Sequence, residues 1–289
     1  MSQVLSTFRS AFGTVVGSSM HVTVVLIVGV AAALASVVVP LLPVVGLFAG
    51  PAFNAVFLAP VTLAALVGSA HAARHGDDAW SGAQSAVEDH WTDLVGAFGL
   101  VAIAWVLVGG ALGTVFVLGA VGIESLTEFD QLRAGRQALL IALPSLAVFG
   151  LSALAGTILQ FVAPAAVVAD ADAVESLRTA VRFVLANPLG VVGFTLTAVG
   201  VALLASVPGV ALAAPVWYVG NPGAAAVILV IGYLEVATVA GAITSMALVE
   251  YFETVADPTV LPDGKRIHGD TADTGAFEFG GTENDAGRV

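Results

Sequence analysis

Residues 22–39 read VTVVLIVGVAAALASVVV, an apolar run that decides the fold class. A helix needs ~20 apolar residues to cross the hydrocarbon core of a bilayer. The run lies inside a longer stretch, from Arg9 to Arg74, that contains no other Asp, Glu, Lys or Arg. That stretch is long enough for two crossings, so the sequence predicts an integral membrane protein from its first quarter alone.

Two prolines divide this uncharged stretch. Pro40 and Pro43 follow the quoted run directly, and proline cannot continue a helix without losing a backbone hydrogen bond. We therefore expect Val22–Val39 to form the first span and Val44–Ala70 the second. The second span is expected to kink near Gly50-Pro51 or near Pro60.

Charged residues bracket the remaining spans. The predicted spans three to six are Leu94–Val121, Ala138–Ala163, Pro188–Ala214 and Ala224–Val249. The last two are separated by a turn-rich stretch, residues 215–223, and its Trp217 and Tyr218 are expected at the membrane–water boundary. The predicted fold class is thus an all-α membrane protein, with a six-helix domain over residues 1–255 and an acidic, disordered cytoplasmic tail over 256–289.

Composition supports this class and excludes others. Of the 289 residues 58% are hydrophobic and only 10% charged, whereas soluble domains carry about 25% charged residues. The net charge is −12, with Lys265 as the single lysine, so nucleic-acid binding is not expected. The acidic, lysine-poor composition indicates a halophilic source. There is no cysteine, and no metal or cofactor site is expected, because the histidines show no recognised ligand spacing (His21, His71, His75, His90 and His268).

Arginine and lysine counts predict the orientation. With six spans, one side receives Arg9, Arg74, Arg178, Arg182, Lys265, Arg266 and Arg288, and the other receives Arg133 and Arg136. The richer side is expected to be cytoplasmic, which places both termini there in a cell-membrane protein. An alternative interpretation of the first span is a cleaved signal peptide, because Ala33-Leu-Ala35 resembles a cleavage site. The apolar run continues past that site, which favours a span.

An internal threefold repeat is also predicted. Residues 4–16 place apolar side chains on one helical face, and residues 173–185 repeat that face 169 positions later. Residues 79–91 repeat it 75 positions after the first, with His90 interrupting the face. The predicted units are about 1–75, 76–169 and 170–255, each an interfacial amphipathic helix followed by two spans.

The junction between amphipathic helix and span carries a helix-capping residue in each unit. These predicted caps are Ser18, Asp93 and Asn187, whose side-chain oxygens accept hydrogen bonds from the first amides of a new helix. Asn187 is followed by Pro188, and proline is favoured at the first helical position.

Part of the third unit resembles a known group. The stretch Phe161-Val-Ala-Pro164-Ala-Ala-Val-Val-Ala-Asp170, followed by Glu175-Ser-Leu-Arg178 and Asn187-Pro188, is similar to a pattern in uncharacterised haloarchaeal six-helix membrane proteins. The same pattern occurs in the membrane domain of some glycerophosphodiester phosphodiesterases. The resemblance covers residues 157–195 and implies the architecture only. No phosphodiesterase catalytic domain is present in this sequence.

One acidic residue falls inside a predicted span. Glu235 is 12 residues past Gly223 and 15 before Glu250, hence near the bilayer midplane, where a carboxylate is costly and a functional suspect. No basic residue occurs within a predicted span to pair with it. Its possible neutral partners are Asn54, Gln160, Thr195, Thr197 and Tyr233. A hydrogen-bonded, protonated glutamic acid is the alternative structural interpretation.

Three functions remain open at this point. The leading hypothesis is a non-enzymatic scaffold or accessory component embedded in the lipid bilayer, because no catalytic constellation is visible. The second is a transporter or permease for a small solute, lipid or ion that uses Glu235. A membrane enzyme comes third, since no cluster of His, Asp and Glu stands out at the interface.

Overall fold

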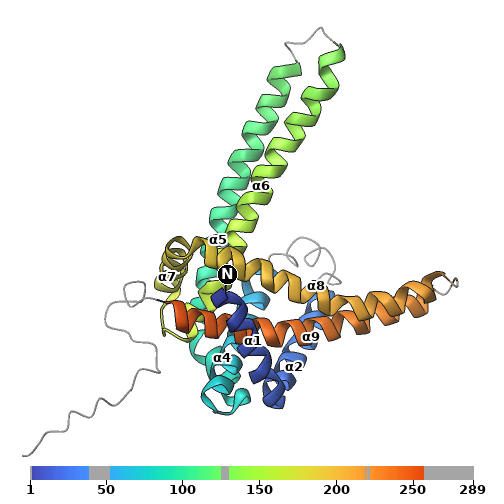
Figure 1. Cartoon of the computed structure of the whole chain (residues 1–289). Helices are drawn as coiled ribbons and strands as arrows, with labels where there is room; N and C mark the ends of the chain where they lie inside the picture. The colour runs from blue at the N-terminus through green and yellow to red at the C-terminus, as the bar shows by residue number, and fades with distance from the viewer. Residues whose placement is uncertain (1, 39–52, 125–129, 219, 221, 257–289) are drawn as a thin grey trace, which may run out of the picture.

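The computed structural model describes residues 2–38, 53–124, 130–218, 220 and 222–256, and all elements within these ranges are helical. The elements run, in order, α1 Ser2–Gly17, α2 Ser19–Val38, the π-helical turn η2 Asn54–Leu58, α4 Ala59–His75, α5 Ala79–Glu124, α6 Asp130–Val167, α7 Ala173–Ala186, α8 Pro188–Tyr218 and α9 Pro222–Val255. Two long hairpins, α5–α6 and α8–α9, leave a common base in different directions (Figure 1). The predicted tail 257–289 lies outside the described residues.

The first pair of helices bends sharply. α1 and α2 meet at 95° across Ser18, whose carbonyl accepts the first hydrogen bond of α2 from the Val22 amide at 3.4 Å. Ser18 therefore occupies the predicted junction. Near the predicted kink lies η2, a π-helical turn that widens the helix just before Pro60, because proline supplies no amide to the turn behind it. The kink itself stays a prediction. Gly50-Pro51 lies outside the described residues.

The second unit differs from its prediction. α5 is one continuous helix of 46 residues, so no helix begins at Asp93 and the predicted N-cap there is wrong. The Asp93 carboxylate instead accepts a hydrogen bond from the Ala173 amide, the first of α7, at 3.2 Å. The residues on both sides of Asp93 favour a helix. The capping preference of Asp93 alone therefore does not interrupt α5.

α7 begins with every one of its first four amides satisfied. Asp93 serves Ala173, the Asp172 carboxylate accepts from Val174 and Glu175, and the Asp172 carbonyl accepts from Ser176. At the other end Asn187 lies at the predicted junction with α8. Its side-chain amide donates to the Phe183 carbonyl at 3.3 Å and closes the end of α7, while its backbone carbonyl accepts the first hydrogen bond of α8 from the Val191 amide at 2.9 Å.

An aromatic cluster forms the core of the base. Phe161 of α6, Phe183 of α7 and Phe194 of α8 are fully buried, and they pack with Tyr251 and Phe252 of α9. Ring centroids are 4.8 Å apart for Phe161 and Phe183, and 5.2 Å apart for Phe194 and Tyr251. The offset, tilted arrangement adds about 0.5–1.5 kcal/mol per pair beyond area burial. The base is therefore a packed core from which the hairpins extend.

Helices α4 and α5 approach so closely that only glycine fits between them. A Cβ at Gly82 would lie 2.7 Å from the Gly68 carbonyl oxygen, and one at Gly68 would collide with Ala86 and Gly82. The chain reverses between the two helices at Gly76, whose φ of 82° closes α4 in a left-handed cap. Small residues thus allow backbone contact, as at helix interfaces in membranes.

Membrane-length helices are present in the described residues. Four helices are long and apolar enough to cross a bilayer, and the bent α1–α2 pair raises this to five if it counts as one span. The expected membrane class is confirmed at this level, while the number six stays a prediction. α8 and α9 meet near Gly220, inside the predicted turn, and each extends a few residues beyond its predicted span.

Candidate functional site

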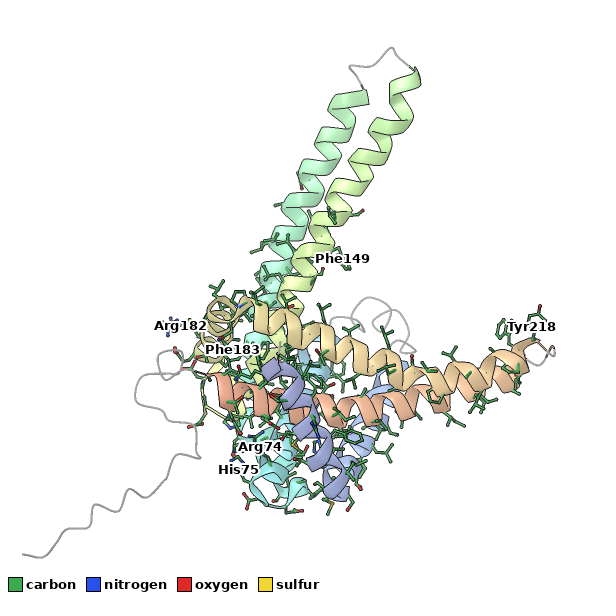
Figure 2. All side chains as sticks on the ribbon, viewed as in Figure 1. Arg74, His75, Phe149, Arg182, Phe183 and Tyr218 are labelled. Carbon is green, nitrogen blue, oxygen red and sulfur yellow. The ribbon has the colours of Figure 1, made fainter. Side chains whose placement is uncertain are left out.

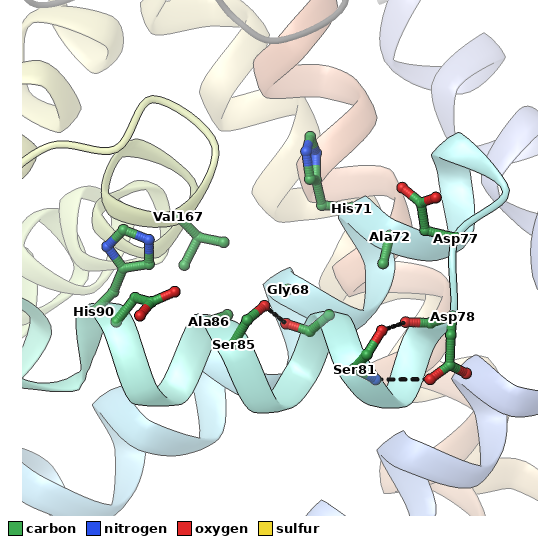
Figure 3. A pocket seen from close by; sticks show the side chains of 12 residues that line it. Gly68, His71, Ala72, Asp77, Asp78, Ser81, Ser85, Ala86, His90 and Val167 are labelled. Carbon is green, nitrogen blue, oxygen red and sulfur yellow. Dashed lines mark hydrogen bonds between the residues drawn. The ribbon is translucent and has the colours of Figure 1, made fainter.

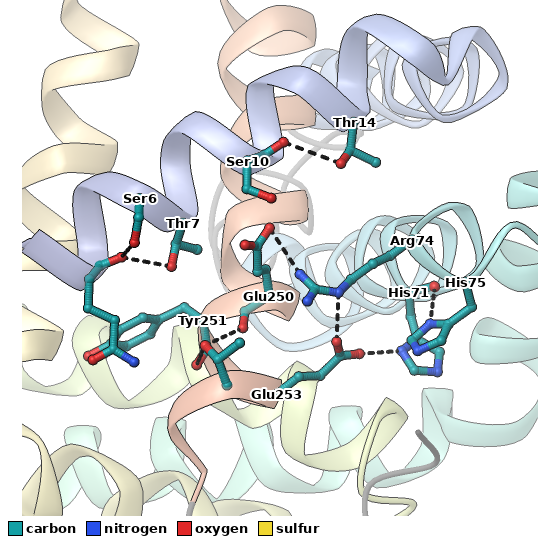
Figure 4. A network of polar contacts seen from close by, with 12 residues as sticks. Ser6, Thr7, Ser10, Thr14, His71, Arg74, His75, Glu250, Tyr251 and Glu253 are labelled. Carbon is teal, nitrogen blue, oxygen red and sulfur yellow. Dashed lines mark hydrogen bonds and ion pairs between the residues drawn. The ribbon is translucent and has the colours of Figure 1, made fainter. Parts of the chain in front are cut away.

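The ends of α4 and α9 bring together a group of ionisable side chains, here called the α4–α9 polar cluster: His71, Arg74, His75, Glu250 and Glu253. On α4 the three basic residues occupy positions i, i+3 and i+4, which share one helical face. They also lie in or next to the last turn of α4, where positive charge complements the helix dipole. The two glutamates are three apart on α9 and face them (Figure 4).

The contacts in the cluster are short. Arg74 donates from Nη1 to Glu250 at 3.0 Å and from Nε to Glu253 Oε2 at 2.9 Å. His71 Nδ1 lies 2.8 Å from Glu253 Oε1. His75 Nδ1 donates to the His71 carbonyl at 2.9 Å, and the two imidazole rings lie 4.5 Å apart. Glu253 is thus held at both oxygens.

Burial makes the charge balance of this cluster important. The Glu253 and Glu250 side chains are only 10% and 13% exposed, and the Arg74 guanidinium lies between them. With neutral histidines, the three ionised side chains leave a net charge of −1. Partly buried charges interact more strongly than surface charges. The cluster therefore favours a further positive charge at its histidine side.

A polar cavity of about 550 Å³ opens beside the cluster. It lies between α4 and the first turns of α5 and includes the following side chains: His71, Asp77, Asp78, Ser81, Ser85, Asp89 and His90. Figure 3 shows the carboxylates and imidazoles around this opening. Ser81 and Asp78 bond to each other locally, with the Ser81 amide 2.9 Å from the Asp78 carboxylate. His71 belongs to both the cavity wall and the cluster.

A second histidine is fully buried in the base. His21 of α2 lies 3.0 Å from the Ser69 hydroxyl of α4 through Nδ1, and 3.3 Å from both the Ala242 carbonyl and the Ser245 hydroxyl of α9 through Nε2. A neutral ring that carries its proton on Nε2 fits this arrangement, because Nε2 then donates to Ala242 and Nδ1 accepts from Ser69. His21 joins three helices and has no access to solvent.

The predicted intramembrane site consists of Glu235 and its possible neutral partners. Glu235 and Tyr233 belong to α9, but their side chains lie outside the described residues. Gln160 donates to the Thr195 hydroxyl at 2.9 Å and so joins α6 to α8. The Thr197 hydroxyl donates to the Gly193 carbonyl. Asn54 has a buried side-chain oxygen without a hydrogen-bond partner among the described residues. Partnership of any of these with Glu235 stays a prediction.

The α4–α9 polar cluster was missed in the sequence. The available signal was the four-residue spacing of His71 and His75, which places two imidazoles on one helical face. Their third partner, Glu253, lies 178 residues beyond His75, at the end of a helix whose position no local pattern indicates. Tertiary packing alone brings it to them.

No family profile, curated protein or solved structure matches this chain. The resemblance of residues 157–195 to the six-helix haloarchaeal group therefore stays a prediction.

Proposed function

We propose that this chain is a multi-pass membrane protein of three repeated units that acts as a non-enzymatic scaffold or accessory component. The units are α1 with α2 and α4, then α5 with α6, then α7 with α8 and α9. Each begins with an amphipathic stretch at the membrane interface, and both chain termini lie in the cytoplasm. Six crossings are proposed, two in each unit.

Burial at equivalent positions supports the repeat. The equivalent positions 5, 80 and 174 carry exposed apolar side chains, as do positions 16, 91 and 185. The equivalent alanines at positions 11, 86 and 180 are all buried. Chance similarity of apolar helices does not require the same residues to point inward. The tryptophans at 80 and 91 favour an interfacial location for the exposed stripe.

The second unit departs from the other two in one respect. Its amphipathic stretch continues without a break into the span, while α1 ends before Ser18 and α7 ends before Asn187. A break between the amphipathic stretch and the span needs a local cause in the sequence. Pro188 enforces it in the third unit, and the second unit has no proline between Ala79 and Glu124.

The scaffold function rests on one observation, the exposed apolar surface of the two hairpins. These helices carry large exposed apolar side chains, namely Val106, Leu107, Leu146 and Phe149 on α5–α6 and Leu203, Leu204, Val210 and Leu212 on α8–α9. Phe149 and Tyr218 in Figure 2 both point outward. Contiguous exposed apolar surface marks contact with lipid or with another membrane protein. A protein that devotes its hairpins to such contact suits an assembly role.

Site-specific photo-crosslinking in native membranes tests this function. A benzophenone amino acid replaces Leu204, which is 74% exposed, and the matched control replaces Phe194, which is buried on the same helix. The expected result is one defined membrane protein, identified by mass spectrometry, attached at position 204 and absent at position 194. Attachment to lipid alone at position 204 and at Leu107 would contradict a scaffold.

Reconstituted vesicles separate the scaffold from a permease. The purified chain and its Glu235→Gln variant are placed in liposomes that contain a pH-sensitive dye, and a proton gradient is applied. A scaffold gives the same flux as empty liposomes with both proteins. Flux that depends on Glu235 would contradict the proposal and support the transporter.

Cysteine labelling tests the proposed orientation in this cysteine-free chain. Single cysteines are introduced at position 78, in the turn after α4, and at position 128, between α5 and α6. Both termini in the cytoplasm require position 78 to be labelled from the cytoplasmic side and position 128 from the outside. The reverse labelling pattern would contradict this orientation and place both termini outside the cell.

A further inference from the structure

We propose that His71, His75 and Glu253 bind a divalent transition-metal ion of the zinc type, and that the ion fastens the end of α9 to the end of α4. The three side chains each offer one ligand atom, and these atoms lie within 4.8 Å of one another. The proposal does not depend on whether the chain acts as a scaffold.

The ligand chemistry points to this class of metal. Two imidazole nitrogens and one carboxylate oxygen form a donor set typical of Zn²⁺ and its neighbours, and it differs from the all-oxygen sets of Mg²⁺ and Ca²⁺. Three protein ligands leave a coordination position for water or an external molecule. The spacing of His71 and His75, one helical turn apart, presents both rings on the same side of α4.

The present contacts are close to what the ion needs. Tetrahedral zinc with bonds of about 2.0–2.1 Å separates its ligand atoms by about 3.3 Å. His71 Nδ1 and Glu253 Oε1 lie 2.8 Å apart, so they must open by roughly half an ångström. The ion takes the place of the proton that these two atoms share, and the neutral His71 ring then carries that proton on Nε2, so no net proton is released. His75 keeps Nε2 free, because its Nδ1 donates to the His71 carbonyl.

Surrounding groups support the site. Arg74 holds the second oxygen of Glu253 at 2.9 Å, which fixes the orientation of the carboxylate, as outer partners do at metal sites. Glu250 neutralises Arg74 at 3.0 Å and so limits its repulsion of a cation. The exposed His75 and the adjacent acidic cavity give an ion a solvent route to the cluster.

Cobalt binding to the full-length protein in detergent tests the proposal. Co²⁺ replaces Zn²⁺ in such sites and reports a low-coordinate environment through its visible d–d absorption, and competition with Zn²⁺ gives the affinity. The test variant is His75→Gln, which removes an exposed ligand outside the ion pairs. The matched control is His90→Gln, a half-buried histidine of the neighbouring cavity that is not among the three ligands.

The expected result is one Co²⁺ per chain, a loss of affinity on the order of 100-fold in His75→Gln, and no change in His90→Gln. Glu253→Gln should lose the absorption as well. Because Glu253→Gln also removes the ion pair with Arg74, equal thermal unfolding of the metal-free His75→Gln variant and of the unchanged protein keeps the test decisive. Absence of the absorption, or its survival in His75→Gln, overturns the proposal. Loss in both histidine variants also overturns it, because the ion then belongs to the cavity.

Discussion

Asp93, in the first third of α5, accepts a hydrogen bond from the backbone amide of Ala173, the first residue of α7, at 3.2 Å. A residue of the second unit thereby satisfies the helix that opens the third. The bond fixes α7 against α5, where Gly96 also lies close to α7, with 3.1 Å between its would-be Cβ and the Cβ of Ala173. The amphipathic helix α7 is therefore held in place by the hydrogen bond at its first residue as well as by the packing of its buried face.

Removal of this cap should weaken the fold. Asp93→Ala is expected to lower the free energy of unfolding by about 1 kcal/mol, because the Ala173 amide loses its partner. Asp93→Asn keeps an acceptor and should cost less. Thermal unfolding of the detergent-solubilised protein measures both. Asp89→Ala, one turn earlier on α5 and exposed, is the matched control, and an equal loss there would show that the effect is only one of helix charge.

The contact between α4 and α5 predicts a steric effect. Gly68→Ala should destabilise the protein by about 1–3 kcal/mol, because the added methyl collides with Ala86 and with the backbone of Gly82. Gly150→Ala in α6 is the control, since a Cβ there meets nothing within 4 Å. Its alanine should be neutral or stabilising, as alanine is favoured over glycine in a helix. Similar melting temperatures for both variants would contradict the close packing.

The ion pairs of the base predict a graded response to loss of an arginine. Arg74→Gln leaves Glu250 and Glu253 largely buried without their cation, and should cost about 3–5 kcal/mol. Arg178→Gln removes the cation of an exposed pair with Glu175 within α7, and should cost about 0–1 kcal/mol. Unfolding at low and high salt distinguishes them, because only the exposed pair is effectively screened. Equal costs would mean that solvent reaches the base pairs.

The buried histidine predicts a fourth kind of effect. His21→Ala should lower the free energy of unfolding by about 2–5 kcal/mol, because it leaves a cavity and removes contacts to two other helices. Ser69→Ala should cost less, since it removes one hydroxyl and leaves the His21 bond to Ala242 in place. Thr23→Ala, exposed on the same helix as His21, serves as the control. A destabilisation no larger than that of the control would contradict the linking role.

The parts of the fold that were predictable are those with a local cause. The apolar run of residues 22–39 became α2 within a few residues at each end, and the Pro-rich and Gly-rich stretch 215–223 contains the turn at Gly220. Proline and charged residues affect the backbone within one helical turn, so their effect can be predicted from the local sequence. Continuity of α5 through Asp93 was not predictable, because the preference of Asp for a cap competes with packing against α7.

The candidate site depended on distant partners. His71 and His75 share a helical face by spacing alone, but Glu253 reaches them only through the packing of α9 on α4. His21 looked like an ordinary polar residue at the start of a span, and its partners lie 48 and more than 200 residues away. Glu235 stood out because the cost of an intramembrane charge is a local property. An isolated charge within an apolar span is thus easier to recognise in a sequence than a buried polar residue whose hydrogen-bond partners lie far away along the chain.

The glycine contact between α4 and α5 also limits how this protein can diverge. Alanine is the smallest possible replacement at position 68 or 82, and at either position its single methyl already collides with the facing helix. We therefore expect residues other than glycine to be poorly tolerated at both positions. A pair of glycines fourteen residues apart, flanked by alanines at 72 and 86, should mark distant relatives of this chain more reliably than any of its ionisable residues.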